Sequence, residues 1–309
     1  MKIWQKYVYP FVAVLFCMII FTPSSSSSQE PKDPLRIIVF GAHPDDCELK
    51  AGGMAAQWAS QGHLVKFVST TNGDIGHATM AGGELAKRRT AEVEKAANIL
   101  GITTQVLDIH DGELMPTLEN RKTLVRLIRE WKADIVIGHR PNDYHPDHRY
   151  TGILMQDAAF MVTVKFYCPD VPHLTQNPVF LYMSDRFQKP APFEPDIVVS
   201  IDKVFDQKMQ ALWTLESQIE SLWATGNFEK IIPVPTDPEK RQKRYDDLYD
   251  RIARRDGSIA DQYRKKLTEV YGQENAQNIK LAEAFELCEY GRQPSKEDLF
   301  ALFLIKESL

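Results

Sequence analysis

Cysteine is scarce in this chain, and its spacing excludes two classes of site. The 309 residues contain four cysteines, Cys17, Cys47, Cys168 and Cys288. None of them forms the C-x-x-C pattern that is typical of thiolate zinc sites and redox dithiols. We therefore expect reduced, mostly buried thiols, with a Cys168–Cys288 disulfide in an oxidising compartment as the open alternative.

The chain also lacks an excess of positive charge. Its 37 basic and 42 acidic residues give a net charge of −5 at pH 7, which excludes the basic surface that nucleic-acid binding requires. The turn at Gly41–Asp46 is not a G-x-G-x-x-G fingerprint, and Asp45 would repel a pyrophosphate there, so both observations argue against dinucleotide binding at this turn. A content of 43% apolar residues indicates a globular protein with a substantial core.

An apolar run near the N-terminus indicates export. Tyr7–Phe21 follows Lys2 and Lys6 and precedes the serine run Ser24–Ser28. These 15 residues are too few to span a hydrocarbon core of about 30 Å comfortably, but they suit a signal peptide. We predict a signal peptide over residues 1–28 and a periplasmic or extracellular protein, with no stable membrane insertion after cleavage. An uncleaved membrane anchor is the alternative.

Strand-like and helix-like segments alternate through the first half of the chain. Such alternation predicts a Rossmann-like, three-layer α/β/α fold whose sheet is mostly parallel, with strand order 3-2-1-4-5. The predicted strands are Leu35–Phe40, Leu64–Thr71, Gln105–Ile109 and Asp134–Gly138, and the predicted helices are Gly52–Gln61, Glu84–Leu100 and Glu119–Trp131.

The second half shows a looser pattern. We predict strands at Val179–Tyr182 and Ile197–Ile201, a helix over Asp202–Ala224, a turn or linker at Ile231–Pro235, and charged helices at Lys240–Tyr271 and Asn278–Leu287. The expected organisation is an α/β domain over residues 34–230, with residues 231–309 packed on it as a C-terminal helical extension.

Two loops rich in histidine and aspartate follow the first and fourth predicted strands. They read GAHPDDCEL from Gly41 and GHRPNDYHPDHRY from Gly138. Because these strands are expected to be neighbours at the switch point of the sheet, the loops should face each other. Clustered carboxylates repel one another unless a cation lies between them, and histidine beside carboxylate is a ligand set of zinc. From this chemistry alone, either Asp45 or Asp46 could be the metal ligand.

The same loops resemble the two signatures of the PIG-L/LmbE-like de-N-acetylases. AHPDD at 42–46 and HPDH at 145–148 carry the resemblance, which runs from about residue 36 to 150 and includes RTAE at 89–92 and DGEL at 111–114. It implies a zinc ion held by His43, Asp46 and His148. It also implies that Asp45 is the general base that activates water.

Further residues complete the expected site. The resemblance implies that His145, held by Asp147, donates a proton to the developing oxyanion or to the leaving amine. We expect Arg89, Asn142 and Asp143 to contact the substrate. A solvated helix position is the alternative for Arg89, and a position beside the metal is the alternative for Asn142 and Asp143. A simple helix-capping role is the alternative for Asp45.

The implied function is zinc-dependent removal of an N-acetyl group from an N-acetylglucosamine-type amino sugar or glycoconjugate. The expected partner is therefore a small-molecule or glycan substrate that carries an N-acetyl group. Two alternatives stay open: an amidase of the same fold acting on a larger acyl amide, and a catalytically silent carbohydrate-binding protein. The helix around Ser217-Gln218 lacks the preceding histidine that the family often carries.

Overall fold

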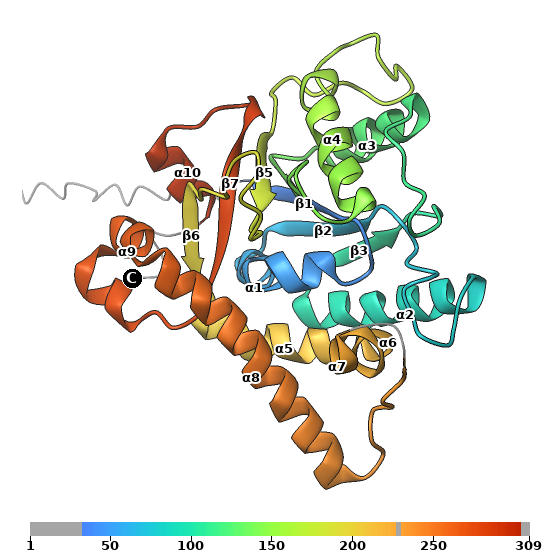
Figure 1. Cartoon of the computed structure of the whole chain (residues 1–309). Coiled ribbons are helices and arrows are strands. Elements are labelled where there is room, and N and C mark those ends of the chain that lie inside the picture. Colours follow the sequence, from blue (N-terminus) through green and yellow to red (C-terminus); the bar gives the residue numbers. More distant parts are fainter. Residues whose placement is uncertain (1–32, 227–229, 304–309) are drawn as a thin grey trace, which may run out of the picture. The chain divides into compact units, whose positions relative to one another are not determined.

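The central feature of the fold is a seven-stranded sheet with strand order β3-β2-β1-β4-β5-β7-β6 (Figure 1). The computed structural model describes residues 33–226 and 230–303. Strands β1 to β5 pair in parallel, and β7 runs antiparallel to both of its neighbours. The predicted α/β class and the order 3-2-1-4-5 are confirmed. The strands are β1 (Arg36–Gly41), β2 (Leu64–Ser69), β3 (Thr103–Val106), β4 (Ile135–Gly138), β5 (Val179–Met183), β6 (Ile197–Ser200) and β7 (Ala282–Gly291).

Strand β1 shows why the sheet is buried on both faces. Side chains alternate across a strand, and here both sets are apolar and completely buried. Ile37 and Val39 join one core cluster, and Ile38 and Phe40 join a second. A strand of this kind needs cover on both sides, as in parallel α/β sheets.

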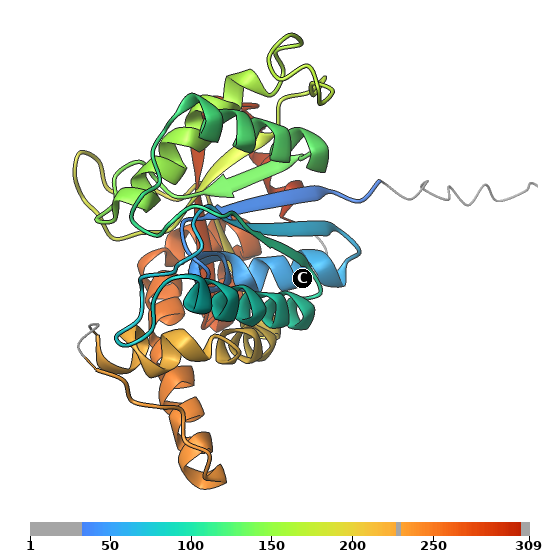
Figure 2. The same ribbon diagram turned by 90° about the vertical axis from the view of Figure 1, so that its right-hand side faces the viewer.

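Helices supply that cover in two layers. α3 and α4 pack on one face, and α1, α2 and α5 on the other (Figures 1 and 2). The helices are α1 (Asp46–Ser60), α2 (Gly83–Leu100), α3 (Leu118–Trp131), α4 (Pro146–Met161), α5 (Phe205–Trp213), α6 (Glu216–Glu220), α7 (Leu222–Thr225), α8 (Pro238–Gln262), α9 (Arg264–Asn278) and α10 (Lys296–Leu302), with a 3₁₀ turn at Asp202–Val204.

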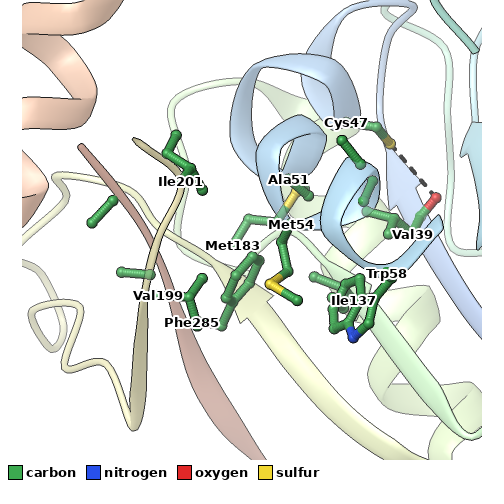
Figure 3. Close-up of a cluster of buried hydrophobic side chains, with 14 of the residues drawn as sticks. Val39, Cys47, Ala51, Met54, Trp58, Ile137, Met183, Val199, Ile201 and Phe285 are labelled. Atoms are coloured by element: carbon green, nitrogen blue, oxygen red, sulfur yellow. Dashed lines mark hydrogen bonds between the residues drawn. The ribbon is translucent and has the colours of Figure 1, made fainter. Parts of the chain in front are cut away.

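The core below α1 joins segments from both halves of the chain. Met54 and Trp58 of α1 pack with apolar residues of the sheet, including Phe285 of β7 (Figure 3). The Cys47 thiol donates to the carbonyl of Val39, 3.6 Å away. The three cysteines of the described residues are free and buried in this structure, so Cys168 and Cys288 are not bonded to each other here.

The predicted helix at Asn278–Leu287 is wrong, because most of this segment belongs to β7. Alanine, glutamate and leucine favour helices, but β7 gains a pairing partner on each edge, β5 on one side and β6 on the other. Its buried Glu283 is neutralised by Lys208, whose Nζ lies 2.9 Å from Oε1. Residues after 231 therefore contribute an internal strand as well as helices.

Other predicted bounds also change. The first helix begins at Asp46 rather than Gly52, so the motif at 42–46 leads directly into it. The predicted helix over Asp202–Ala224 is divided into a 3₁₀ turn and α5, α6 and α7. The predicted helix over Lys240–Tyr271 is two helices that meet at Tyr263.

The predicted signal peptide, residues 1–28, lies outside the described residues. Among the described helices, none combines the length and the apolar character that crossing a membrane would require.

Candidate metal centre

The two motifs meet where β1 and β4 end. These strands are hydrogen-bonded neighbours in the sheet, and Figure 2 shows that they run in the same direction. Gly41 permits the sharp return of the chain into α1, because a Cβ at this position would lie 2.9 Å from both Asp46 Cβ and Cys47 Sγ. The local sequence thus brings the first motif back under the end of its own strand.

Three predicted ligand atoms form a compact triangle. His43 Nδ1 lies 3.2 Å from His148 Nε2, and Asp46 Oδ2 lies 3.5 Å from each of these nitrogens. Zinc bonds of about 2.0–2.2 Å at tetrahedral angles place ligand atoms about 3.3–3.5 Å apart. The donor types and their separations therefore fit a zinc ion, with a fourth position left for another ligand.

Carboxylates hold the far side of the His43 ring. Its Nε2 lies 3.0 Å from Asp111 Oδ1 and 3.2 Å from Asp147 Oδ2. Burial lowers the pKa of His43, but hydrogen bonds to Asp111, Asp147 and Asp46 outweigh it and leave the pKa well above its usual value. This environment attracts a cation, and it directs Nδ1 toward the triangle as supporting carboxylates do in zinc sites.

A second group of donor atoms, from His43, Asp111, His145 and Asp147, also lies close enough to surround an ion. Two of its ligand atoms already accept hydrogen bonds from backbone N–H groups. Asp147 Oδ2 accepts from the Gly112 N–H at 2.6 Å, and His145 Nδ1 accepts from the Asp147 N–H at 3.2 Å. We therefore interpret this group as support for His43 rather than as a second metal site.

Asp46 is held in place by the backbone and by a histidine absent from the predicted site. Its Oδ2 accepts from the N–H groups of Ala42 and His43, at 3.0 and 2.9 Å. His139 Nε2 lies 3.3 Å from the same oxygen, and burial lowers the pKa of His139 to about 3. A neutral His139 therefore packs beside the triangle, stacked on His148. Its place directly after β4 was the signal that could have identified it.

Asp45 is a buried acid of the centre whose side chain has no hydrogen-bonding partner within residues 33–226 and 230–303. It occupies the N-cap position of α1, yet its side chain makes no capping hydrogen bond, so the helix-capping alternative is wrong. Its carboxylate lines the cleft and forms no hydrogen bond with the described residues. Burial, reinforced by the nearby Asp46, raises the pKa of Asp45 to about 6, which is suitable for accepting a proton near neutral pH.

His145 and Asp147 begin α4, but their relationship differs from the expected one. His145 is the N-cap, and its Nδ1 accepts from the Asp147 N–H. A neutral His145 therefore carries its proton on Nε2. The Asp147 carboxylate lies 3.9 Å from His145 Nδ1 but only 3.2 Å from His43 Nε2. Asp147 thus supports His43 first, because the N–H groups of Gly112 and Leu114 fix its orientation.

The three residues predicted to contact the substrate, Asp143, Asn142 and Arg89, occupy different positions relative to the cleft. Asp143 Oδ1 lies 3.1 Å from His148 Nδ1, so this carboxylate orients a predicted ligand instead of being free for substrate. Burial raises the pKa of Asp143, but the contact with His148 outweighs it and lowers the pKa to about 2. Asn142 is not among the described residues that line the cleft.

Arg89 lines the cleft but is buried, so its alternative as a solvated helix residue is wrong. Its Nη2 donates to the carbonyl of Gly76 at 2.5 Å. A Cβ at Gly73 or Gly76 would lie 2.7 Å from Nη1, and Gly73 has a positive φ of 68°. The glycines of this loop therefore let the backbone approach the guanidinium closely. The positive charge of the guanidinium interacts with the carboxylate of Asp45.

The centre opens into a cleft of about 910 Å³. Residues far along the chain complete its wall, including Gln218 of α6, Trp223 of α7 and Arg255 of α8. The side-chain oxygen of Gln218 is buried and has no partner among the described residues. These wall residues were not predicted, because their helices carry no motif and reach the cleft only through tertiary packing.

Comparisons with known proteins identify related sequences and a related fold. Residues 38–159 match the family model described as PIG-L: GlcNAc-PI de-N-acetylase. The chain is 32% identical over 204 residues to the diacetylchitobiose deacetylase of Thermococcus kodakarensis, covering 62% of this chain and 73% of that protein. It is also 28% identical over 197 residues to the 4-oxalmesaconate hydratase of Pseudomonas putida, covering 60% and 74%.

Among solved structures, the N,N'-diacetylchitobiose deacetylase of Pyrococcus horikoshii aligns with a TM-score of 0.62. The alignment covers 83% of this chain and 85% of that one at 22% sequence identity, which shows a shared fold.

Proposed function

Because the chain belongs to the PIG-L (GlcNAc-PI de-N-acetylase) family, we propose that it is a zinc-dependent hydrolase. It removes the N-acetyl group from an N-acetylglucosamine-type sugar or glycoconjugate. The observation that carries this proposal is the triangle of His43, Asp46 and His148 beside the unpartnered carboxylate of Asp45.

The ligands and the base divide the reaction between them. His43, Asp46 and His148 would hold the zinc ion, which as a Lewis acid would polarise the acetamide carbonyl and lower the pKa of a water to about 7. Asp45 takes a proton from the attacking water while the water oxygen bonds to the carbonyl carbon. When the C–N bond breaks, that proton passes to the leaving nitrogen, so the products are acetate and a primary amine.

His145 supplies a hydrogen-bond donor for the charge that develops on the carbonyl oxygen. Its Nδ1 is already occupied by the Asp147 N–H, so Nε2–H is the remaining donor of the neutral ring. Burial lowers the pKa of His145, and His43 and His148 lower it further, which keeps the ring neutral. Such a donor at an oxyanion is worth about 10²–10³ in kcat.

The test is hydrolysis of N,N'-diacetylchitobiose and N-acetylglucosamine by the purified chain, with released acetate and new primary amine measured together. We expect zinc-dependent turnover that falls by about 10²–10⁴ in Asp45→Asn, with zinc content unchanged. Asp170→Asn, which alters an exposed ion pair with Arg126, is the matched control and should retain activity. Stoichiometric zinc without acetate release from either sugar would contradict the proposal.

The hydratase relative makes water addition to a carbon–carbon double bond a second candidate reaction. A metal and a general base could serve that chemistry too, and the relative is 28% identical to this chain. Deacetylation is favoured because the family model and the 32% identical relative are both de-N-acetylases. An amidase acting on a larger acyl group would release that acid instead of acetate, so the same assay on longer N-acyl glucosamines distinguishes it.

A further inference from the structure

A third loop borders the metal centre, beside the two loops that carry the motifs. β5 pairs in parallel with β4 and ends at Met183, so the residues that follow it lie at the same edge of the sheet as both motifs. All four residues of Ser184–Phe187 line the cleft. The Phe187 ring lies 6.2 Å from the ring of Tyr144, and the Tyr144 ring lies 5.4 Å from that of His148. The loop after β5 therefore continues the wall of the cleft from the second motif.

Asp185 is the acid of this loop, and one of its carboxylate oxygens is firmly held. Its Oδ1 accepts from the Phe187 N–H at 2.9 Å and lies 3.3 Å from Arg140 Nη1. Arg140 is itself buried and fixed, because its Nη2 donates to the carbonyl of Ala191 at 2.7 Å and its Nε lies 3.4 Å from Glu286 Oε2. The backbone and an anchored guanidinium thus determine how the Asp185 side chain is oriented.

The second carboxylate oxygen of Asp185, Oδ2, is different. The side chain is only 4% exposed, and Oδ2 is buried without a hydrogen-bonding partner within residues 33–226 and 230–303. Burial raises the pKa of Asp185, although the Phe187 N–H, Arg140 and Lys50 each lower it. A buried acceptor without a donor costs about 1–3 kcal/mol. A ligand in the cleft that supplies the donor recovers this free energy on binding.

The charges around Asp185 determine which kind of donor suits Oδ2. Arg140 lies directly against the carboxylate. The wall of the cleft carries four more cations, Lys50, Arg89, Arg186 and Arg255. An ammonium group would be repelled by this positive charge. A neutral hydroxyl group avoids the repulsion and still donates to an ionised acceptor, which makes a stronger hydrogen bond than a neutral one.

The spacing of the strands places Asp185 beyond the reacting acetamide. β4 lies between β1 and β5 in the sheet. Because neighbouring strands are about 4.8 Å apart, the end of β5 is about 10 Å from the end of β1, which precedes His43. On a sugar whose acetamide lies at the metal centre, the hydroxyl groups at C4 and C6 are farther from the acetamide than the one at C3. These two are therefore the candidates for a contact with the loop after β5.

We propose that Asp185 is a specificity-determining residue, which accepts a hydrogen bond through Oδ2 from the C4 or C6 hydroxyl group of the N-acetylated sugar. The inference rests on the proposed deacetylase function and adds a residue that neither motif contains. It accounts for the buried oxygen in the cleft wall that lacks a donor. The alternative is that Asp185 serves only as the counter-ion of Arg140, in which case no substrate hydroxyl group depends on it.

The test is a scan of hydroxyl groups on the substrate. The zinc-loaded protein is assayed with N-acetylglucosamine and with its 3-deoxy, 4-deoxy and 6-deoxy analogues, and acetate release gives kcat/KM for each sugar. We expect kcat/KM for the 4-deoxy or the 6-deoxy sugar to be about 10- to 100-fold lower than for the parent sugar, as for loss of a hydrogen bond to a charged group.

Asp185→Ala should abolish this discrimination. Its kcat/KM for the parent sugar should fall by the same factor of about 10 to 100, mainly through KM, while kcat/KM for the sensitive deoxy sugar stays unchanged. A structural defect would instead lower both values alike and preserve their ratio. Asp185→Asn keeps the shape of the side chain without its charge and should retain part of the ratio. The matched control is Glu286→Gln, because Glu286 shares Arg140 but does not line the cleft; it should retain the full ratio.

Three results would overturn the assignment and leave the proposed function standing. The first is wild-type deacetylation of the 4-deoxy and 6-deoxy sugars as fast as of the parent sugar. The second is an unchanged ratio in both Asp185 variants. The third is an equal loss of the ratio in Glu286→Gln, since the effect would then pass through Arg140.

If none of the sugars is deacetylated, the proposed function fails, and calorimetry with the same sugars decides the role of Asp185. Binding that weakens when one hydroxyl group is removed, in the wild type but not in Asp185→Ala, supports the assignment. Equal binding of all four sugars by the wild type refutes it.

Discussion

Asp147 provides a sharp test of how the metal centre is held together. Its side chain is completely buried and accepts three donors: the N–H of Gly112 at 2.6 Å, the N–H of Leu114 at 3.2 Å and His43 Nε2 at 3.2 Å. The amide of Asp147→Asn has one oxygen and one NH₂ group. Whichever way the amide turns, at least one of the three donors faces the NH₂ group and loses its acceptor; the contact from Leu114 is buried, and those from Gly112 and His43 are part-buried.

The expected magnitudes follow from that count. A buried donor without a partner costs about 1–3 kcal/mol in the free energy of unfolding. Loss of the carboxylate behind a ligating histidine costs about 10- to 100-fold in metal affinity. Asp147→Asn should therefore bind zinc about 10- to 100-fold more weakly and unfold about 1–3 kcal/mol more easily.

The assay is competition for zinc with a chromophoric chelator, accompanied by urea denaturation. Asp170→Asn is the control, since its exposed ion pair with Arg126 should contribute less than about 1 kcal/mol. Zinc affinity of Asp147→Asn within threefold of wild type would refute the role of this carboxylate behind His43. A selective loss of turnover with unchanged affinity would instead favour the originally expected link to His145.

Three further outcomes are expected. Asp45 must be ionised to act as a base and its pKa is about 6, so kcat/KM should fall tenfold per pH unit below that value. A bound cation moves this acidic limb of the pH–rate profile to lower pH. An acidic limb centred above pH 7 would exclude Asp45 as the base. Lys208→Met leaves Asp256 and Glu283 buried without their cation and should cost about 3–5 kcal/mol in urea denaturation; a loss below 1 kcal/mol would show that these buried ion pairs are dispensable. Chelation should lower the melting temperature, because zinc at 100 times its Kd stabilises the fold by about 2.7 kcal/mol; identical melting with chelator and with zinc would exclude a folded-state zinc site.

The first half of the fold was predictable because its signals are local. Continuous apolar strands such as β1 and β4 can only be buried on both faces, and parallel connection then fixes their order. The positions where these strands end determine which loops meet, so the convergence of the two motifs was predictable from the sequence pattern. The choice of Asp46 over Asp45 as a ligand came from the family resemblance.

The rest depended on long-range partners that leave no local signal. β7 reads as a helix because it is rich in alanine and glutamate, and its charged Glu283 is tolerated in the interior only because Lys208 lies opposite. The family resemblance implied that Asp147 holds His145, but its carboxylate lies 3.9 Å from His145 Nδ1 and only 3.2 Å from His43 Nε2. The structure shows that the backbone of 112–114 turns its carboxylate toward His43.

The position of β7 also constrains how the chain is made. This strand comes from residues 282–291 but lies between β5 and β6, so both of its neighbours are synthesised before the strand that pairs with them. During that interval the edges of β5 and β6 expose unpaired N–H and C=O groups, which are templates for association with other chains. Biosynthesis of this protein therefore includes a vulnerable period that ends only when β7 inserts between β5 and β6.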